Sequence, residues 1–200
     1  MEFIIIGIII LFVVLIICLS QGDSGDRYDR EQREIKNAGN FGETICKSEI
    51  EQILRSDDVL INNVCLSVNG KEAEIDNLIT NKNGIFIIEV KNYNGTLHGD
   101  IDDFEWTKIK ISPGGNTFSK KVKNPIRQMK RQTYLLSQYL KDNGIWIWIT
   151  PFAYFINNNS PVNDECIISN IQELDKRIHK SHEKIYNDEV ISKAEKLLSK

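Results

Sequence analysis

The sequence contains few cysteines and none of the spacings that would pair them. The four thiols are scattered, without a CxxC pair or a histidine spacing that builds a zinc site: Cys18, Cys46, Cys65 and Cys166. The first of them lies in an apolar N-terminal run, and the remaining odd number suits a reducing compartment better than a disulfide scaffold. The sequence therefore argues against a structural zinc site and a disulfide framework, and we expect buried thiols.

The sequence also lacks a large charge of either sign. Its 25 Lys and Arg residues nearly balance its 28 Asp and Glu residues, for a formal net charge of -3. Any binding of nucleic acid must therefore use a local basic surface rather than the field of the whole protein. No internal repeat or low-complexity tract interrupts residues 37–200, which have the length of one domain.

A long apolar run occupies residues 3–19, FIIIGIIILFVVLIICL. As a helix, such a run nearly spans a hydrocarbon core of about 30 Å. A cleaved signal peptide is the alternative, but no Lys or Arg precedes the run and no A-x-A site follows it. We predict one transmembrane helix within residues 1–20, which contacts the lipid bilayer through residues 3–19, and a polar juxtamembrane linker over residues 21–36.

The charges on the two sides of this run predict its orientation. Only the α-amino group and Glu2 precede the run, whereas four basic residues follow it: Arg27, Arg30, Arg33 and Lys36. Positive charge close to a membrane span favours the cytoplasmic side. We therefore expect a single-pass membrane protein whose C-terminal domain, residues 37–200, lies in the cytoplasm.

The hydrophobic pattern of residues 37–200 predicts an α/β domain. Apolar residues at helical spacing from Ile45 to Leu54 indicate a first helix, which carries Glu43 in its first turn. Three antiparallel strands with Asn-Gly turns follow, at Val59–Val68, Ala73–Thr80 and Ile85–Lys91. Further strands are expected within 96–111 and 117–122, along 145–156, where the strand is interrupted or bent near Pro151, and near 166–168. Further helices are expected from Asn124-Pro125, over 171–178 and over 190–198. Strands bracketed by helices predict a mixed central β-sheet flanked by helices.

The second and third strands carry the residues with catalytic potential. Residues two apart in a strand share a face, so Glu89 and Lys91 project together. A two-residue turn at Asn83-Gly84 would set Asp76 almost opposite Lys91 and close to Glu89. Two carboxylates offer hard oxygen ligands to Mg²⁺ or Mn²⁺, which activates a water, and the ammonium of Lys91 can stabilise the charge that develops on a phosphate. This pattern predicts a metal-dependent phosphodiesterase.

Each of these residues also has a structural explanation. An isolated Glu-x-Lys pair is ordinarily a surface ion pair on an edge strand. The apolar run Ile85–Ile88 argues against that explanation, because four consecutive apolar residues mark a strand covered on both faces. For Asp76 the alternative is a cross-strand salt bridge to Lys91.

Taken together, these segments resemble the nuclease-related domain (NERD) family of the PD-(D/E)xK, or restriction-endonuclease-like, superfamily. The resemblance covers residues 39–156 and rests on Gly39-Asn40-Phe41-Gly42-Glu43, Glu74-Ile75-Asp76, Ile88 to Gly95 (IEVKNYNG), Trp106, and Asn124-Pro125 with Gln128. It implies a restriction-endonuclease-like core with these catalytic residues: Glu43, Asp76, Glu89, Lys91 and Gln128. It also implies that Asp76, Glu89 and Glu43 bind the metal. The helix dipole is another explanation for Glu43, and an exposed first helical turn is another for Gln128.

A basic segment without acidic residues runs from Lys108 to Arg131. A solvated surface is the ordinary explanation, but such a segment would also neutralise phosphates near the site. We expect contacts with nucleic acid from Lys120, Lys121, Lys123, Arg127, Lys130 and Arg131. The three tryptophans, Trp106, Trp146 and Trp148, are expected in the core rather than as base-stacking platforms.

The sequence thus predicts a membrane-anchored nuclease that depends on Mg²⁺ (or Mn²⁺) and hydrolyses phosphodiester bonds of nucleic acid, with DNA ahead of RNA as the substrate. The alternative is a catalytically silent, membrane-tethered module that keeps the nuclease fold and binds nucleic acid or transmits a signal.

Overall fold

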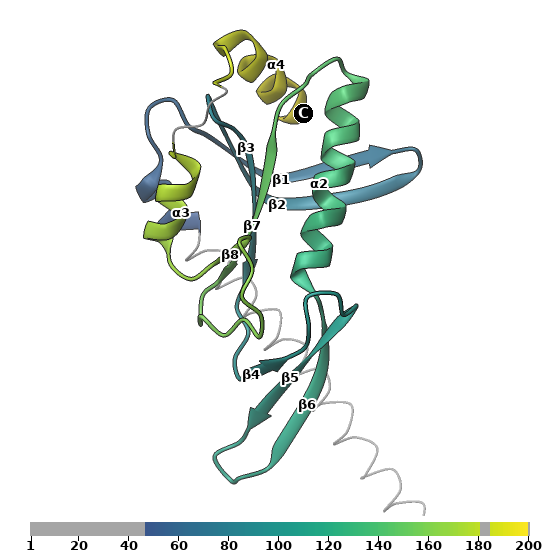
Figure 1. The fold of residues 1–200 in the computed structure, drawn as a ribbon, viewed down its shortest axis with the longest axis vertical. Coiled ribbons are helices and arrows are strands. Elements are labelled where there is room, and N and C mark those ends of the chain that lie inside the picture. Colours follow the sequence, from purple (N-terminus) through teal and green to yellow (C-terminus); the bar gives the residue numbers. More distant parts are fainter. Residues whose placement is uncertain (1–46, 181–184, 200) are drawn as a thin grey trace, which may run out of the picture. The chain divides into compact units, whose positions relative to one another are not determined.

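The computed structural model describes residues 47–180 and 185–199, which form a mixed α/β arrangement (Figure 1). A mixed sheet has the strand order β1-β2-β3-β7-β8. Its members are β1 (Val59–Val68), β2 (Lys71–Asn81), β3 (Gly84–Lys91), β7 (Ile149–Phe155) and β8 (Ile167–Ile168). The first three strands are antiparallel, whereas β7 runs parallel to β3 and β8 runs parallel to β7. The predicted mixed sheet and its three antiparallel strands are confirmed.

Helices flank this sheet, and a second, smaller sheet adjoins one of them. Residues 47–53 are helical, and α2 (Pro125–Asp142), α3 (Ile171–Ile178) and α4 (Asp188–Leu198) follow. The second sheet has the order β4-β5-β6, from β4 (Thr96–His98), β5 (Glu105–Ile111) and β6 (Thr117–Lys123). Figure 1 shows that this sheet lies beyond the N-terminal end of α2.

Strand β3 is buried on both of its faces. Ile85 and Ile87 pack in a cluster with side chains of α2 and α4, whereas Phe86 and Ile88 pack in another with Ile50 and side chains of α3. All four residues of the run are at most 1% exposed. The strand is therefore covered on both sides, as its apolar sequence predicts, and the residues that continue the face of Ile85 and Ile87 point toward α2.

The turn between β2 and β3 lies one residue earlier than the sequence predicts. Gly84 already belongs to β3, where it pairs with Asn81, so the two turn residues are Lys82 and Asn83. Gly84 has φ +139°, and a Cβ atom there would lie 2.7 Å from the carbonyl oxygen of Trp148. This close approach requires glycine inside the strand rather than in the turn.

The observed register corrects the position expected for Asp76. The last pair of the β2–β3 ladder on this side joins Asn77 to Ile88, so residue numbers of partners sum to 165 rather than to the 167 of the expected turn. The predicted register, with Asp76 almost opposite Lys91, is therefore wrong by two residues, because the turn is shifted. Asp76 nevertheless lies near enough to Lys91 to raise the pKa of its ammonium.

Strand β7 runs without interruption through Pro151, where an interruption or bend was expected. Pro151 lies opposite Ile87 in the parallel ladder. The amide of Ala153, two residues further on, donates to the carbonyl of Cys166 on the β8 side, at 2.8 Å. Because Pro151 lies two residues before Ala153, its nitrogen also faces the β8 side of the strand. Strand β8 does not extend as far as Pro151, so the missing N–H costs no hydrogen bond of the ladder.

Two of the three tryptophans lie outside the core. Trp106 is fully buried, as expected, but Trp146 is 68% and Trp148 is 70% exposed. The segment before β7 alternates, with Ile145 and Ile147 packed in the core cluster next to α2. The core prediction for Trp146 and Trp148 is wrong, because the alternating isoleucines fill the inward positions.

The described cysteines also differ from the expectation of buried thiols. Cys65 is exposed, and Cys166 is partly buried. Burial and a hydrogen bond to Asp164 raise the pKa of the Cys166 thiol to about 12, so this thiol stays protonated at neutral pH. Cys18 and Cys46 lie outside the described residues.

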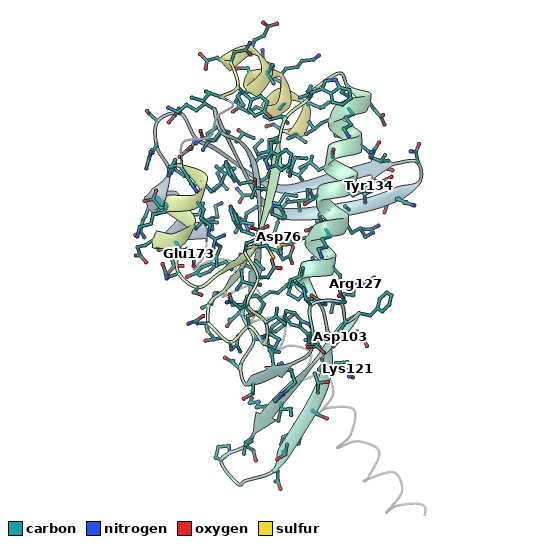
Figure 2. The ribbon with its side chains drawn as sticks, viewed as in Figure 1. Asp76, Asp103, Lys121, Arg127, Tyr134 and Glu173 are labelled. Atoms are coloured by element: carbon teal, nitrogen blue, oxygen red, sulfur yellow. The ribbon has the colours of Figure 1, made fainter. Side chains whose placement is uncertain are left out.

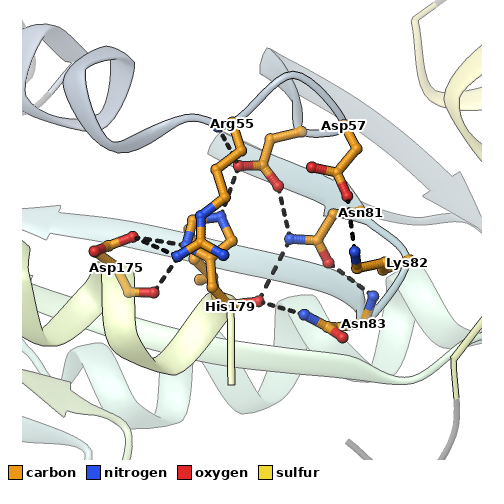
Figure 3. Close-up of polar contacts among 9 residues, drawn as sticks. Arg55, Asp57, Asn81, Lys82, Asn83, Asp175 and His179 are labelled. Carbon is orange, nitrogen blue, oxygen red and sulfur yellow. Dashed lines mark hydrogen bonds and ion pairs between the residues drawn. The ribbon is translucent and has the colours of Figure 1, made fainter. Parts of the chain in front are cut away.

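A buried polar cluster fixes the closed end of the β2–β3 hairpin (Figure 3). His179 Nε2 lies 2.7 Å from Asp58 Oδ2, and its Nδ1 lies 2.6 Å from Asp175 Oδ1. Asn81 Nδ2 donates to Asp58 Oδ1 at 2.8 Å, and Asn83 Nδ2 donates to the Ile178 carbonyl at 3.0 Å. The sequence does not predict this role for His179. The cluster ties the turn to the end of α3 and thereby holds the strands that carry Asp76 and Glu89.

No helix within the described ranges is long and apolar enough to cross a membrane. The predicted anchor (residues 3–19), the linker (residues 21–36) and Glu43 all fall outside those ranges.

The cluster predicts a large difference between two neighbouring aspartates. The Asp58 side chain is fully buried, whereas Asp57 forms an ion pair with Lys82 at 3.4 Å in which the side chains are 48% and 57% exposed. Asp58→Ala leaves buried donors unpaired and should lower the free energy of unfolding by about 3 kcal/mol. Asp57→Ala should lower it by less than about 1 kcal/mol. Denaturant unfolding measures both, and equal losses would contradict the structural role of the cluster.

Candidate active site

The candidate site begins where β3 leaves the core. Glu89 is only 2% exposed, and the Lys91 Nζ atom lies 2.5 Å from its Oε1. Strand β3 lies between β2 and β7, so it is not an edge strand. An exposed ion pair on an edge strand is therefore ruled out for Glu89 and Lys91. A carboxylate this deeply buried requires a compensating charge and hydrogen bonds.

Electrostatics keep the Lys91 ammonium charged. Burial by itself lowers the pKa of this group, because the charged form loses hydration. The Glu89 carboxylate, with the additional effects of Tyr93 and Asp76, outweighs burial, so the pKa of the ammonium is raised above its ordinary value. The Lys91 side chain is therefore a cation and a hydrogen-bond donor at neutral pH.

Gln132 holds the other oxygen of Glu89. Its Nε2 donates to Glu89 Oε2 at 3.1 Å and to the Glu74 carbonyl at 2.8 Å. The side chain is 3% exposed and lies on α2. The sequence does not predict this contact. The available signal was the spacing of four residues from Gln128, which sets two helical side chains on one face.

The orientation of the Gln132 amide follows from its neighbours. Both groups next to its Nε2 are acceptors, so the reversed amide would bring oxygen against oxygen. The Oε1 atom therefore points away from Glu89. It is buried and has no hydrogen-bond partner within the part of the chain that the structure describes. A buried acceptor without a donor is costly, which makes Oε1 a candidate partner for a polar group of a ligand.

Gln128 lies at the same place, with a weaker contact. Its Oε1 is 3.5 Å from Lys91 Nζ, at the outer limit of a hydrogen bond. Asn124 caps α2, accepting at its side chain from the Ile126 amide at 2.9 Å, and Pro125 occupies the first turn. The predicted helix start is confirmed, and it places Gln128 and Gln132 one above the other against the end of β3.

Asp76 lies at a local break in the alternation of β1 and β2. Asn62 pairs with Asn77, and Val64 pairs with Ile75, on the two sides of this position. The residue facing Asp76 in this register is Asn63, which has φ +55°.

In each of the two strands, the alternation of inward and outward side chains shifts by one residue at this break. Within one core cluster, Ile61 and Leu78 lie on one side of the break, and Val64 and Ile75 lie on the other. Both strands therefore exchange their faces at this point, which is the point where the half-buried Asp76 occurs.

The described carboxylates do not by themselves form a cluster that could hold a metal ion. Within the described ranges, no group of three or more His, Cys, Asp or Glu side chains is arranged to hold a metal ion. The oxygen ligands that the site offers there are the carboxylates of Asp76 and Glu89, and Glu43 lies outside those ranges.

A groove of about 1160 Å³ borders the site. Its floor includes Gln128 and Gln132, the two residues that contact Lys91 and Glu89. The other lining residues are Cys65, Leu66, Ser67, Glu72, Ala73, Glu74, Phe104, Glu105, Lys123, Asn124, Arg127 and Arg131. A ligand in this groove would meet the two glutamines that contact the buried Glu-x-Lys pair.

Some of the basic residues expected to contact nucleic acid line the groove, and others do not. Lys123, Arg127 and Arg131 line the groove. Lys121 lies on the same face of β6 as Lys123, because the two are two residues apart, and Lys120 lies on the opposite face. Figure 2 shows Lys121 on β6 and Arg127 in the first turns of α2.

Lys130 belongs to a different part of the surface. It acts electrostatically on Asp164 and Cys166, which do not line the groove. Of the six basic residues predicted to contact nucleic acid, four therefore lie on the groove side: Lys121, Lys123, Arg127 and Arg131.

A mixed sheet with a buried Glu-x-Lys pair at the end of an internal strand defines a nuclease-like domain. The model of the nuclease-related domain (NERD) family matches residues 38–156, so the chain belongs to this family, which is part of the restriction-endonuclease-like superfamily. An uncharacterised protein of Bacillus anthracis is 27% identical over 103 residues, which is 51% of this chain and 48% of that protein. The chain therefore spans about half the length of this relative. No solved structure matches the chain.

The role of Gln132 can be tested against a second glutamine of α2. Gln132→Leu removes the amide that holds Glu89 Oε2 and should lower the free energy of unfolding by about 1–3 kcal/mol. Gln138→Leu, the same substitution at a position that is only partly buried, should change it by less than about 0.5 kcal/mol. Urea unfolding compares the two variants, and an equally small loss in Gln132→Leu would show that this amide does not support Glu89.

Proposed function

We propose that this chain is a metal-dependent nuclease that hydrolyses phosphodiester bonds of nucleic acid. The observation that carries the proposal is the buried Glu89, which is held between Lys91 and Gln132, where Gln132 also lines a groove with basic residues. Membership of a nuclease-related family supports the same class of reaction. A buried ion pair is a poor device for stability alone, so its position at the groove favours a catalytic role.

The side chains of the site divide the work of hydrolysis. The charged Lys91 ammonium orients the attacking water and stabilises the negative charge that develops on the phosphate. Gln132 fixes the direction of Glu89, and Gln128 adds an amide oxygen beside Lys91. The basic residues of the groove, Lys123, Arg127 and Arg131, neutralise the phosphates of the bound strand.

The residues present fit a hard divalent cation. Asp76 and Glu89 supply carboxylate oxygens, and the buried Gln132 Oε1 supplies an acceptor for a water on such an ion. Glu43 is the third ligand in this proposal. When bound, Mg²⁺ or Mn²⁺ would lower the pKa of a water and neutralise charge on the phosphate.

The proposal also includes the cellular setting. The apolar run of residues 3–19 anchors the chain in a membrane, and the basic residues that follow it place the domain in the cytoplasm. DNA is the first substrate to test, followed by RNA.

The proposal predicts cleavage that needs both the metal and the Glu-x-Lys strand. The full chain in mild detergent is incubated with labelled single- and double-stranded DNA and RNA, with Mg²⁺ or Mn²⁺. We expect cleavage that EDTA abolishes and that falls about 100-fold or more in Asp76→Ala and Lys91→Ala, because each substitution removes a group at the developing charge. Gel electrophoresis with time measures the rate.

Lys110→Ala serves as the matched control, because Lys110 is an exposed lysine of β5 that does not line the groove. Its rate should stay within about twofold of the unmodified chain, apart from any general effect of surface charge. Binding of nucleic acid without cleavage, unchanged in the Asp76 and Lys91 variants, would overturn the enzymatic proposal and favour a silent binding module.

A further inference from the structure

Phe104 presents an aromatic ring at the edge of the groove. The side chain is 78% exposed, which is more than any other large hydrophobic side chain among the described residues. A single exposed hydrophobic residue is ordinary on a protein surface. Phe104 differs from that case because it lines the same groove as Gln128 and Gln132, the residues that contact Lys91 and Glu89.

The loop that carries Phe104 is held rigidly by Asn124. The buried Asn124 Nδ2 donates to the Ile101 carbonyl at 2.9 Å and to the Asp103 carbonyl at 2.8 Å. Its backbone amide donates to the Phe104 carbonyl at 3.2 Å. Asn124 is also the N-cap of α2, so one residue joins the backbone of the Phe104 loop to the helix that carries Gln128 and Gln132. The backbone at Phe104 is therefore held next to the start of that helix.

Arg127 covers one face of the ring. Its guanidinium carbon lies 3.9 Å from the ring centroid, and its Nη1 donates to the Asp102 carbonyl at 3.1 Å. A planar cation stacked on an aromatic ring stabilises the ring's orientation. Because Phe104 remains 78% exposed with Arg127 in place, its opposite face is open to a ligand.

The charges near Phe104 suit a phosphate backbone. Lys123 and Arg127 line the groove on this side, with Lys121 on the same face of β6. The acidic Glu105 pairs across the strands with Lys123. The other acidic lining residues, Glu72 and Glu74, belong to β2, and the aspartates of the Phe104 loop do not line the groove.

We propose that Phe104, backed by Arg127, is a stacking platform for one base of an unpaired nucleic-acid strand beside the scissile phosphate. The inference rests on the proposed nuclease function and adds the substrate class, a single strand or an opened end. A ring can stack on a base only when that base is free of its neighbours, which a continuous duplex does not allow. The platform and the basic residues beside it therefore select single strands over intact duplexes.

The test compares two exposed phenylalanines in the full chain. Phe104→Ala removes the platform, and Phe118→Ala removes a ring that is 58% exposed on β6 but does not line the groove. Binding to a fluorescent single-stranded oligonucleotide and to a duplex hairpin of the same length is measured by anisotropy in EDTA, so that no hydrolysis is required. A second oligonucleotide series carries 2-aminopurine at successive positions, because its fluorescence is quenched when it stacks on an aromatic ring.

We expect Phe104→Ala to weaken single-strand binding about tenfold, in the range of one lost base–aromatic stack, and to leave duplex binding unchanged. Quenching of 2-aminopurine at one position should be lost in Phe104→Ala and kept in Phe104→Trp and Phe118→Ala. Unchanged single-strand affinity in Phe104→Ala, equal losses for the duplex, or the same loss in Phe118→Ala would overturn the platform. If Phe104 governs binding but no cleavage occurs with Mg²⁺ or Mn²⁺, the proposed nuclease function fails, and the platform stands as a binding site for an unpaired strand.

Discussion

The burial of one carboxylate constrains the rest of this structure. Glu89 follows four apolar residues of an internal strand, so it leaves the core with only 2% of its surface exposed. A charge in that position has to be compensated, and Lys91 and Gln132 contact its two oxygens. Helix α2 must therefore lie against the end of β3, and the hairpin from Asp76 to Glu89 must keep its register.

Asn124 connects the helix that meets Glu89 to the loop of Phe104 at the groove. Its side chain caps α2 and, through the carbonyls of Ile101 and Asp103, braces the loop of Phe104. The polar cluster of Asp58 and His179 has the same function at the other end of the sheet, where it fixes the β2–β3 turn. Both clusters use buried hydrogen bonds to make positions that are distant in the sequence rigid relative to one another.

Patterns of neighbouring residues predicted most of the fold. The run Ile85–Ile88 indicated a strand buried on both faces, and Asn124-Pro125 indicated the start of a helix, because each signal is local. The register of Asp76 was not predictable from the Asn83-Gly84 pair. Gly84 lies inside β3, where the Trp148 carbonyl comes too close for a Cβ atom, and not in the turn. Gln132 was missed for a similar reason. Which side of a helix meets a buried carboxylate depends on tertiary packing, which no spacing within the helix specifies.

The most direct test of a metal centre at Glu89 is a titration of Mn²⁺ into the full chain, with the free ion measured by electron paramagnetic resonance. Glu89→Gln keeps the shape of the side chain but removes its charge, and Glu105→Gln does the same at an exposed position of the groove. We expect saturable binding of Mn²⁺ that is lost in Glu89→Gln and retained in Glu105→Gln. Equal binding by the unmodified chain and both variants would contradict a metal site built on Glu89.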